Sequence, residues 1–209
     1  IPLIAGGVGA SKSGEITTFG DGGSDYTAAV VGAVLGADDV QLWTDVNGMM
    51  TADPHKVAKA FTIPLLSFEE AMELCHFGTH IVVPQAMQPA FDAGIPILIK
   101  NSLNPDHPGS RITAQTPEHG TTITAISSIS SIALLRLQGS GMLGVAGTAR
   151  RLFDALSRNK ISIILITQAS SEHSICFAIP PQAVRTAQKA IEQEFALEIK
   201  THQIEPVLV

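Results

Sequence analysis

The chain has 209 residues, of which 45% are hydrophobic and 15% are charged, and its net charge at pH 7 is −6. This composition can bury a sizeable core and suits one large domain or two small ones. The acidic balance argues against nucleic acid as the main partner. No apolar run reaches the roughly 18 residues that a membrane-spanning helix needs, so no membrane partner is expected.

The two cysteines, Cys75 and Cys176, are too few for a disulfide framework, so we expect a cytoplasmic protein. None of the seven histidines stands at metal-ligand spacing from a second histidine or a cysteine, and no metal site built from such ligands is expected. No signal peptide is recognisable at the start of the chain. The chain begins at Ile1 without an initiator Met, which predicts a fragment of a longer protein or a processed chain.

Strands alternate with helices in the first 110 residues, which predicts an α/β domain with a largely parallel sheet. Ser24 or Asp25 is the expected N-cap of the first helix, and Ser67 with Glu70 forms a capping box for the second. The expected strands are 2–5, 40–43 and 95–99, and the expected helices are 26–35, 67–77 and 89–93.

Turn-forming residues fill positions 101–109, and a polar stretch follows at 115–122. We therefore place a linker at 111–122 and a second domain at 123–209. That domain has the order β-α-β-β-α-β, a ferredoxin-like unit. Its expected strands are 132–137, 161–166, 174–179 and 197–202, its helices are 145–158 and 181–195, and a tight hairpin covers 170–173.

A glycine-rich turn from Gly141 to Gly147 opens the first helix of the second domain, and the next strand ends at Gln168. This order places a turn with several backbone amides beside one side-chain carboxamide. Such a cleft suits a free amino acid, so the segment predicts regulation by a small metabolite.

Two segments of the first domain leave alternatives open. Residues 17–26 form a glycine-rich turn before a helix, which is either an anion site or a tight connection that needs positive φ. The loop at 43–54 follows a buried strand, where Asp45, Asn47 and Asp53 could face a nucleotide or its Mg²⁺. The spacing of these three residues favours Asx turns in an irregular loop.

Together these motifs resemble the aspartokinase family, and within it the threonine-sensitive enzymes fused to homoserine dehydrogenase. The motifs are G-G-S-D-Y-T-A-A-V (22–30), W-T-D-V-N-G-M-M-T-A-D-P (43–54), S-F-E-E-A-M-E-L (67–74), I-L-I-K-N-S-L-N-P (97–105), I-T-Q-A-S-S-E-H-S-I (166–175) and E-F-A-L-E-I-K (194–200). The resemblance implies the C-terminal half of an amino-acid-kinase α/β sandwich at 1–110, followed by a ferredoxin-like βαββαβ ACT domain.

The resemblance further implies phosphorylation of L-aspartate with ATP and Mg²⁺, threonine as the effector, and a homodimer or larger assembly formed through ACT domains. By motif, Asp25 is the catalytic residue, and Gly23 and Ser24 bind substrate. The residues implied at the nucleotide site are Thr44, Asp45, Met50, Asp53, His55 and His80. Those implied at the effector site are Gly141, Met142, Leu143, Gly144, Gly147, Gln168 and Ala169.

Several positions depart from the family pattern. Asp21 stands where an arginine usually clamps the substrate carboxylate, and His55 and His80 stand where cations face phosphate. An acid at position 21 replaces attraction by repulsion, worth about 4 kcal/mol at 4 Å and an effective dielectric near 20. We therefore expect the chain alone to be inactive as a kinase, and an inactive regulatory module that binds an amino acid is the alternative function.

Overall fold

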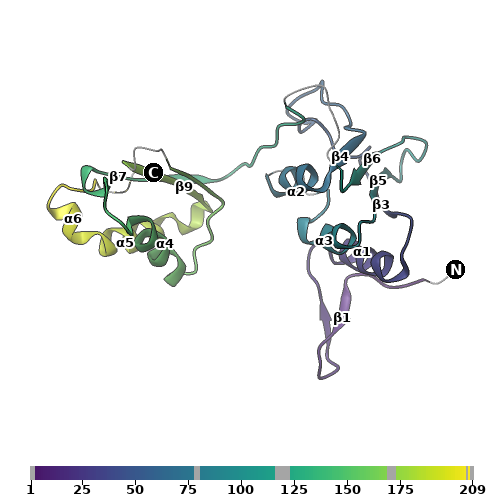
Figure 1. The fold of residues 1–209 in the computed structure, drawn as a ribbon, viewed down its shortest axis with the longest axis horizontal. Helices are drawn as coiled ribbons and strands as arrows, with labels where there is room; N and C mark the ends of the chain where they lie inside the picture. Colours follow the sequence, from purple (N-terminus) through teal and green to yellow (C-terminus); the bar gives the residue numbers. More distant parts are fainter. Residues whose placement is uncertain (1–2, 78–80, 116–122, 169–172, 206, 208–209) are drawn as a thin grey trace. The chain divides into compact units, whose positions relative to one another are not determined.

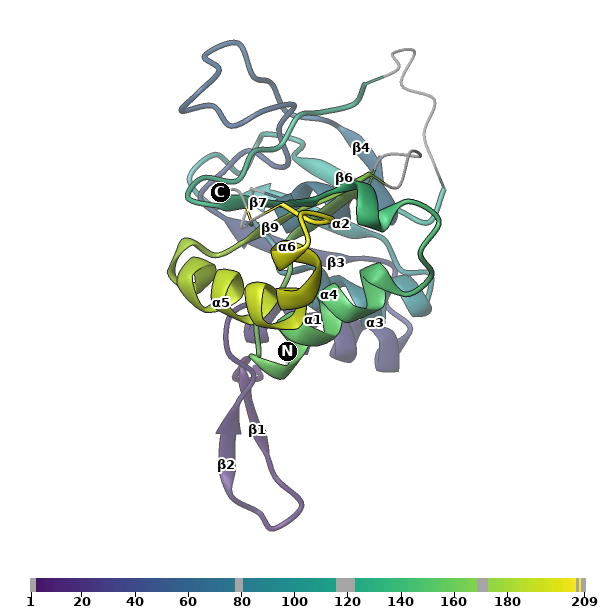
Figure 2. The same ribbon diagram turned by 90° about the vertical axis from the view of Figure 1, so that its left-hand side faces the viewer.

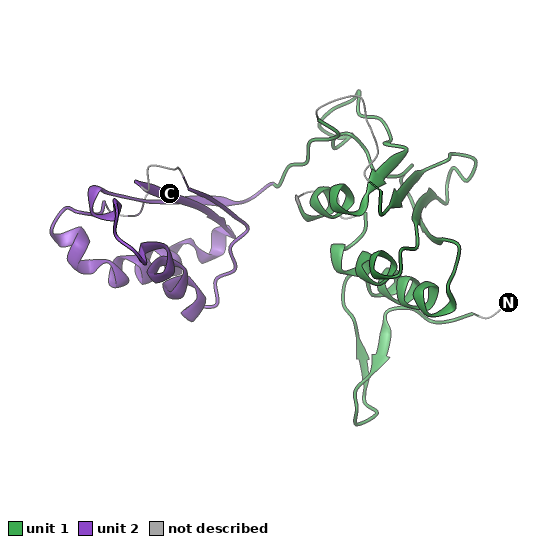
Figure 3. Cartoon of the chain, in the orientation of Figure 1, with its two compact units in different colours: residues 1–129 green, residues 130–209 purple. Residues whose placement is uncertain are grey.

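The computed structural model describes residues 3–77, 81–115, 123–168, 173–205 and 207, which are drawn in two views in Figures 1 and 2. The chain divides into two compact units, Ile1–Ile129 and Ser130–Val209, which are coloured separately in Figure 3. Each unit has a hydrophobic core of its own, and each is described by itself.

Unit 1 contains a four-stranded sheet with helices packed beside it (Figure 1). The strand order is β3-β5-β6-β4, with β3 parallel to β5, β4 parallel to β6, and β5 antiparallel to β6. The core gathers fully buried side chains such as Leu66, Phe68 and Ile99. The elements are β3 (Val40–Thr44), β4 (Leu65–Ser67), β5 (Ile97–Asn101), β6 (Ser110–Thr113), α1 (Gly23–Leu35), α2 (Phe68–Phe77) and α3 (Pro84–Asp92).

The capping box of α2 is confirmed. The backbone amide of Ser67 donates to the Glu70 carboxylate at 2.9 Å, and the Glu70 amide donates to the Ser67 hydroxyl at 3.1 Å. The predicted cap of α1 was wrong, because this helix starts at Gly23 and its N-cap is Gly22 in the left-handed conformation. A Cβ at Gly22 would also lie 2.6 Å from the Val83 side chain, so only glycine fits.

The strand predicted at 2–5 was also wrong over its described residues. The first strands are β1 (Val8–Ala10) and β2 (Ile16–Thr18), an antiparallel ribbon that projects from the rest of unit 1 (Figure 2). Gly7, with φ of 77°, turns the chain before β1 and prevents a strand from continuing across it.

Helix α3 begins at Pro84, earlier than predicted, because proline suits the first helical turn. The sequence also missed β4 and β6, strands of three and four residues. Strand β6 covers the first residues of the linker that we expected at 111–122. Its Ser110 is held inside unit 1, where its hydroxyl donates to the Ile63 carbonyl at 2.6 Å and accepts from the Met49 amide at 2.9 Å.

Unit 2 has a three-stranded antiparallel sheet in the order β7-β9-β8, and α4 and α5 cover one face of it (Figures 1 and 2). Leu135, Leu152, Phe177 and Ile191 are fully buried between these layers. The elements are β7 (Ala133–Gln138), α4 (Thr148–Arg158), β8 (Leu165–Gln168), β9 (Ser174–Ile179), α5 (Val184–Glu194) and α6 (Ala196–Lys200), with short 3₁₀ turns η1 (Ser140–Met142) and η2 (Pro181–Ala183).

The predicted final strand at 197–202 was wrong, because this segment is the helix α6. The Ile199 amide donates to the Phe195 carbonyl and the Thr201 amide to the Leu197 carbonyl, both at 2.9 Å. The chain reaches the edge of β7 just after this helix, where the Glu205 amide donates to the Gln138 carbonyl at 2.8 Å. The strand predicted at 161–166 is β8, displaced towards Gln168, and the hairpin predicted at 170–173 lies mostly outside the described residues.

An ion-pair network ties α4 to α5 and α6. The Arg151 guanidinium lies 3.1 Å from the Glu194 carboxylate, donates to the Glu194 carbonyl at 2.7 Å and binds the Glu198 carboxylate. It also lies over the Phe195 ring, 4.5 Å from the ring centroid. The hydrogen bond from Arg151 lowers the pKa of the Glu198 carboxyl. Among the described helices of either unit, none is long and apolar enough to cross a bilayer.

Candidate functional site

A hollow of about 330 Å³ opens in unit 2 between the start of α4 and the end of β8. Its lining is partly apolar, with Val145 and Ile175, and its polar side chains among the described residues are Gln168 and Thr148. The lining residues are Met142, Gly144, Val145, Ala146, Gly147, Thr148, Ala149, Gln168 and Ile175.

The register of the sheet explains how Gln168 reaches this hollow. Gln168 of β8 is paired with Ile175 of β9, so the two side chains point to the same face of the sheet. That face is the one covered by α4, because Ile175 belongs to the buried core of unit 2. Gln168 is the last residue of β8 and stays exposed, so its carboxamide remains available to a ligand.

Most amides of the glycine-rich turn do not face the hollow. The amides of Met142, Leu143 and Val145 donate within the turn itself, at 3.2–3.3 Å, and the Gly141 amide donates to the Gln203 carbonyl at 2.8 Å. The donors offered to a ligand are therefore the first amides of α4, which have no partner inside the helix.

Helix α4 is well suited to hold an anion at this end. Its N-cap is Gly147, with φ of 93° and no side-chain cap among the described residues. The Thr148 hydroxyl donates to the Val145 carbonyl at 3.2 Å. The backbone amides of Thr148 and Ala149 are the first of the helix, so they point out of its end, and both residues line the hollow. Unpaired amides and the helix dipole both favour a carboxylate there.

Four of the seven residues expected at the effector site line the hollow: Met142, Gly144, Gly147 and Gln168. Gly141 and Leu143 do not line it, and Ala169 lies outside the described residues. Val145 and Ala146 also line it and lie within the turn at 141–147 that was expected to supply amides, whereas Thr148, Ala149 and Ile175 were missed. The position of the helix start was the signal that could have found most of them.

In unit 1, the start of α1 packs closely against a preceding glycine pair. A Cβ at Gly6 would lie 2.9 Å from Ser24 Cα, and one at Gly23 would lie 2.9 Å from Gly7 Cα. Thr27 secures this contact, since its hydroxyl accepts from the Gly7 amide at 3.2 Å and donates to the Gly23 carbonyl at 2.9 Å. The contact presents Ser24 at the surface in the first turn of α1.

Asp25 lies in the first turn of α1 and is half-buried. Burial raises the pKa of its carboxyl, and a hydrogen bond from Ser24 partly offsets that effect. Nearby, Asp21 lines a smaller hollow of about 180 Å³ together with the rings of Phe19 and Tyr26. None of the described residues that line this smaller hollow is a cation.

The loop after β3 uses most of its polar side chains for its own structure. The Asp53 carboxylate accepts from the His55 amide at 2.9 Å, which is the Asx turn that the spacing favoured. The Asn47 side-chain oxygen accepts from Asn101 at 2.8 Å. Asp45 is exposed and accepts from the Thr44 hydroxyl at 3.2 Å, so these two groups remain at the carboxyl end of β3.

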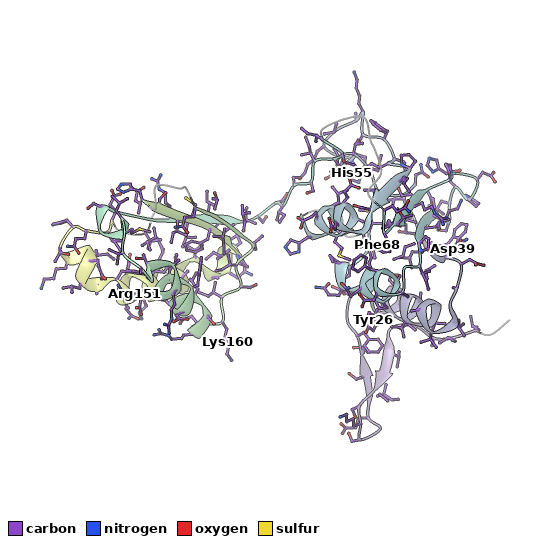
Figure 4. The ribbon with its side chains drawn as sticks, in the orientation of Figure 1. Tyr26, Asp39, His55, Phe68, Arg151 and Lys160 are labelled. Atoms are coloured by element: carbon purple, nitrogen blue, oxygen red, sulfur yellow. The ribbon has the colours of Figure 1, made fainter. Side chains whose placement is uncertain are left out.

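The other residues expected at a nucleotide site are less well placed. Met50 forms an isolated β-bridge with Thr62. His55, which is labelled in Figure 4, is exposed on the loop. His80 lies outside the described residues. In the described part of the chain, no three His, Cys, Asp or Glu side chains form a group that could hold a metal ion.

Comparison with known proteins gives two family matches. Residues 1–101 match the amino acid kinase family, and residues 135–195 match the ACT domain. The bifunctional aspartokinase/homoserine dehydrogenase of Haemophilus influenzae is 41% identical over 209 residues, which is 100% of this chain and 26% of that protein. The chloroplastic aspartokinase 1 of Arabidopsis thaliana is 35% identical over 210 residues, which is 100% of this chain and 36% of that protein.

Solved structures give the same result. The R-state of E. coli aspartokinase III in complex with aspartate and ADP is 31% identical, with a TM-score of 0.73. It matches over 97% of this chain and 45% of that chain. The T-state of the same enzyme in complex with lysine and aspartate has a TM-score of 0.64.

The chain thus spans about a quarter to a third of the curated relatives above, and less than half of the E. coli enzyme. Within that span it combines part of an amino acid kinase fold with an ACT domain. The chain belongs to the aspartokinase family.

Proposed function

We propose that the chain is part of an ATP-dependent aspartate kinase and that its ACT domain senses a free amino acid, with threonine as the effector. The observation that carries the sensing role is the hollow between α4 and β8, which is lined by Gln168 and by the start of a helix that no described side chain caps. The kinase activity belongs to the longer protein, because the chain covers only a minor part of its relatives.

The chemistry of the hollow supports an amino acid with a short side chain. The first amides of α4, at Thr148 and Ala149, would bind the carboxylate of the ligand. The carboxamide oxygen of Gln168 would accept from the ammonium group. Val145 and Ile175 offer apolar contact to a methyl group, and the Gln168 amide could also bind a hydroxyl, which together favour threonine.

For the kinase reaction, the start of α1 would hold the acceptor. Gly23 and Ser24 would bind aspartate, and the half-buried carboxylate of Asp25 would orient a cationic group of the longer protein. Thr44 and Asp45, at the carboxyl end of β3, would contact the nucleotide. A relative supports this assignment, since the E. coli aspartokinase III structure is a complex with aspartate and ADP.

Mg²⁺ fits the described residues only in part. Magnesium prefers several oxygen ligands, and it usually keeps waters and binds through one or two carboxylates with substrate phosphates. The exposed Asp45 can supply one carboxylate, while the Asp53 carboxylate is turned to its own loop and Met50 and His55 offer no oxygen side chain. When bound, the ion would neutralise charge on the transferred phosphoryl group.

The ACT domain is also the proposed site of self-association. Strand β8 is an edge of its described sheet, and all four of its residues, Leu165–Gln168, are exposed. An exposed apolar edge strand readily pairs with another chain. A second copy placed there would lie next to Gln168, so a homodimer would bring two effector sites together.

A thermal-shift screen with threonine, lysine, methionine and aspartate tests the sensing role. Threonine should raise the unfolding temperature most, because binding to the folded state alone stabilises it. Gln168→Ala should weaken threonine binding by about 1.5–3 kcal/mol, the usual range for a hydrogen bond to a charged group. Gln182→Ala is the matched control, since Gln182 is exposed in the same unit and does not line the hollow. Equal threonine affinity in the two variants would refute the assignment of Gln168.

The second candidate is a regulatory module without kinase activity, and Asp21 is the observation that favours it. This carboxylate lines the small hollow beside the start of α1, where a substrate carboxylate would need a cation. A coupled ADP-release assay on this chain with aspartate tests that effect of Asp21. We expect background turnover from this chain, and robust turnover would show that Asp21 does not prevent substrate binding.

A further inference from the structure

A second hollow in unit 2 lies between α4 and α5 and shares no residue with the effector hollow. Its volume is about 490 Å³. We call it the cationic groove, and the residues that line it are Asn159, Arg185, Thr186, Lys189, Ala190 and Gln193. From this groove we propose that unit 2 binds a diphosphate-bearing metabolite at a site separate from the amino acid.

The two cations of α5 have no acidic partner. Within the described part of the chain, neither Arg185 nor Lys189 forms an ion pair. They stand four residues apart on one helix face, where like charges repel and weaken the helix. No carboxylate of the described residues lines the groove, and Glu192, the nearest acid along α5, is not among its lining residues. An anion bound between the two cations would remove this repulsion.

The end of α4 adds positive charge to the same region. An adjoining hollow of about 190 Å³ shares Asn159, Ala190 and Gln193 with the groove and is also lined by Arg158 and Glu194. Glu194 is already engaged by Arg151 at 3.1 Å and lies 3.8 Å from Arg158, so its charge is compensated. Lys160 extends from the end of α4, where Figure 4 labels it.

This local charge differs from that of the whole chain. Residues 130–209 contain eight Lys and Arg against six Asp and Glu, whereas the full chain has a net charge of −6. Three of those eight cations, Arg158, Arg185 and Lys189, line the groove or the adjoining hollow. A cluster of that kind in an acidic protein attracts anions over a distance.

The chemistry of the lining groups favours phosphate over carboxylate. Arginine binds phosphate oxygens through two parallel N–H bonds, and Lys, Asn, Thr and Gln side chains can all donate to further oxygens. Positions four residues apart on a helix are about 5–6 Å apart at Cβ, so one phosphoryl group can meet Arg185 and a second can meet Lys189. A diphosphate therefore fits this spacing better than a single phosphate.

Calorimetric titration of the whole chain with inorganic pyrophosphate at low salt tests the proposal. We expect binding tighter than about 1 mM, weaker binding of orthophosphate and of citrate, and no competition from threonine. Arg185→Gln and Lys189→Gln should each weaken pyrophosphate about tenfold or more, and the double variant should weaken it further. Lys12→Gln combined with Lys200→Gln is the matched control, because it removes the same charge from exposed positions outside the groove.

The variants should remain folded, since removing like charges four residues apart does not weaken α5. Their unfolding temperatures by circular dichroism should therefore equal or exceed that of the unchanged chain. Equal loss of pyrophosphate binding in the groove variants and the control would show a diffuse charge effect and overturn the proposal. Citrate binding as tight as pyrophosphate, or no pyrophosphate binding below about 1 mM, would also overturn it.

Discussion

Arg151→Met tests whether the ion-pair network holds the helical layer of unit 2 together. Methionine keeps the length of the side chain over Phe195 but removes the guanidinium. The variant loses the contacts to the carboxylate and carbonyl of Glu194 and to the carboxylate of Glu198. Those two carboxylates are only 22% and 19% exposed, so water replaces the lost partner incompletely.

The magnitude follows from the exposure of the network. Hydrogen bonds to charged groups contribute about 1.5–3 kcal/mol when buried, and exposed ion pairs contribute about 0–1 kcal/mol. The Arg151 side chain is 41% exposed and makes three such contacts, so about 1 kcal/mol each is reasonable. We therefore expect a loss of about 2–3 kcal/mol in the free energy of unfolding of unit 2, and a lower unfolding temperature.

Hydrogen exchange of the whole chain can measure this loss, because it reports the amides of α4 and α5 separately from those of unit 1. Arg150→Met is the matched control. Arg150 is the neighbouring residue, its side chain is 84% exposed, and its one ion pair with a described residue is a 3.5 Å contact with Asp154 one turn away. That control should cost less than about 0.5 kcal/mol. Equal effects of the two substitutions would refute the network argument.

The remaining predictions concern pH and helix capping. The Arg151 hydrogen bond lowers the pKa of Glu198, so its stabilising effect is present above the unfolded-state pKa and is lost as the pH falls through the folded-state pKa. In urea unfolding, the difference between the unchanged chain and Arg151→Met should therefore shrink below about pH 4, and a difference that grows there would contradict this sign. Ser67→Ala should lower the free energy of unfolding of unit 1 by about 1 kcal/mol, because Ser67 caps α2. Ser102→Ala is the control and should cost less in the same assay, because it removes only a contact in an exposed turn.

The sequence predicted most elements of unit 2 but not the helix α6. Phe195, Leu197 and Ile199 alternate as in a strand, yet Phe195 and Ile199 also have helical spacing. The structure buries Phe195 and half-buries Ile199, while Leu197 is 71% exposed. Both patterns were compatible with the sequence. The helix is selected by the packing of Phe195 and Ile199 into the core of unit 2.

The structure has a hollow at the segment where the sequence predicts an effector site, but some of the amides expected to line it are used elsewhere. Gly147 and Gln168 line it as expected, because a helix start and a strand end can both be read from the sequence. The amide of Gly141 is directed instead to Gln203, more than sixty residues along the chain. A contact of that separation leaves no local signal, so the sequence could not reveal that this amide is already used.

The short strands of unit 1 were missed for a similar reason. Strand β4 has three residues, and β6 begins at Ser110, whose hydroxyl binds the backbone of Met49 and Ile63. Neither strand has enough residues for a clear alternation of apolar and polar side chains. By contrast, the capping box of Ser67 and Glu70 is local, and it was predicted correctly.

Titration of the isotope-labelled chain with threonine, followed by NMR, shows whether threonine binds in the hollow between α4 and β8. We expect the largest shifts at the backbone amides of Thr148 and Ala149 and at the side-chain amide of Gln168, which line the hollow. Saturating threonine that leaves these three signals unchanged, or that shifts mainly residues elsewhere in the chain, would contradict this proposal.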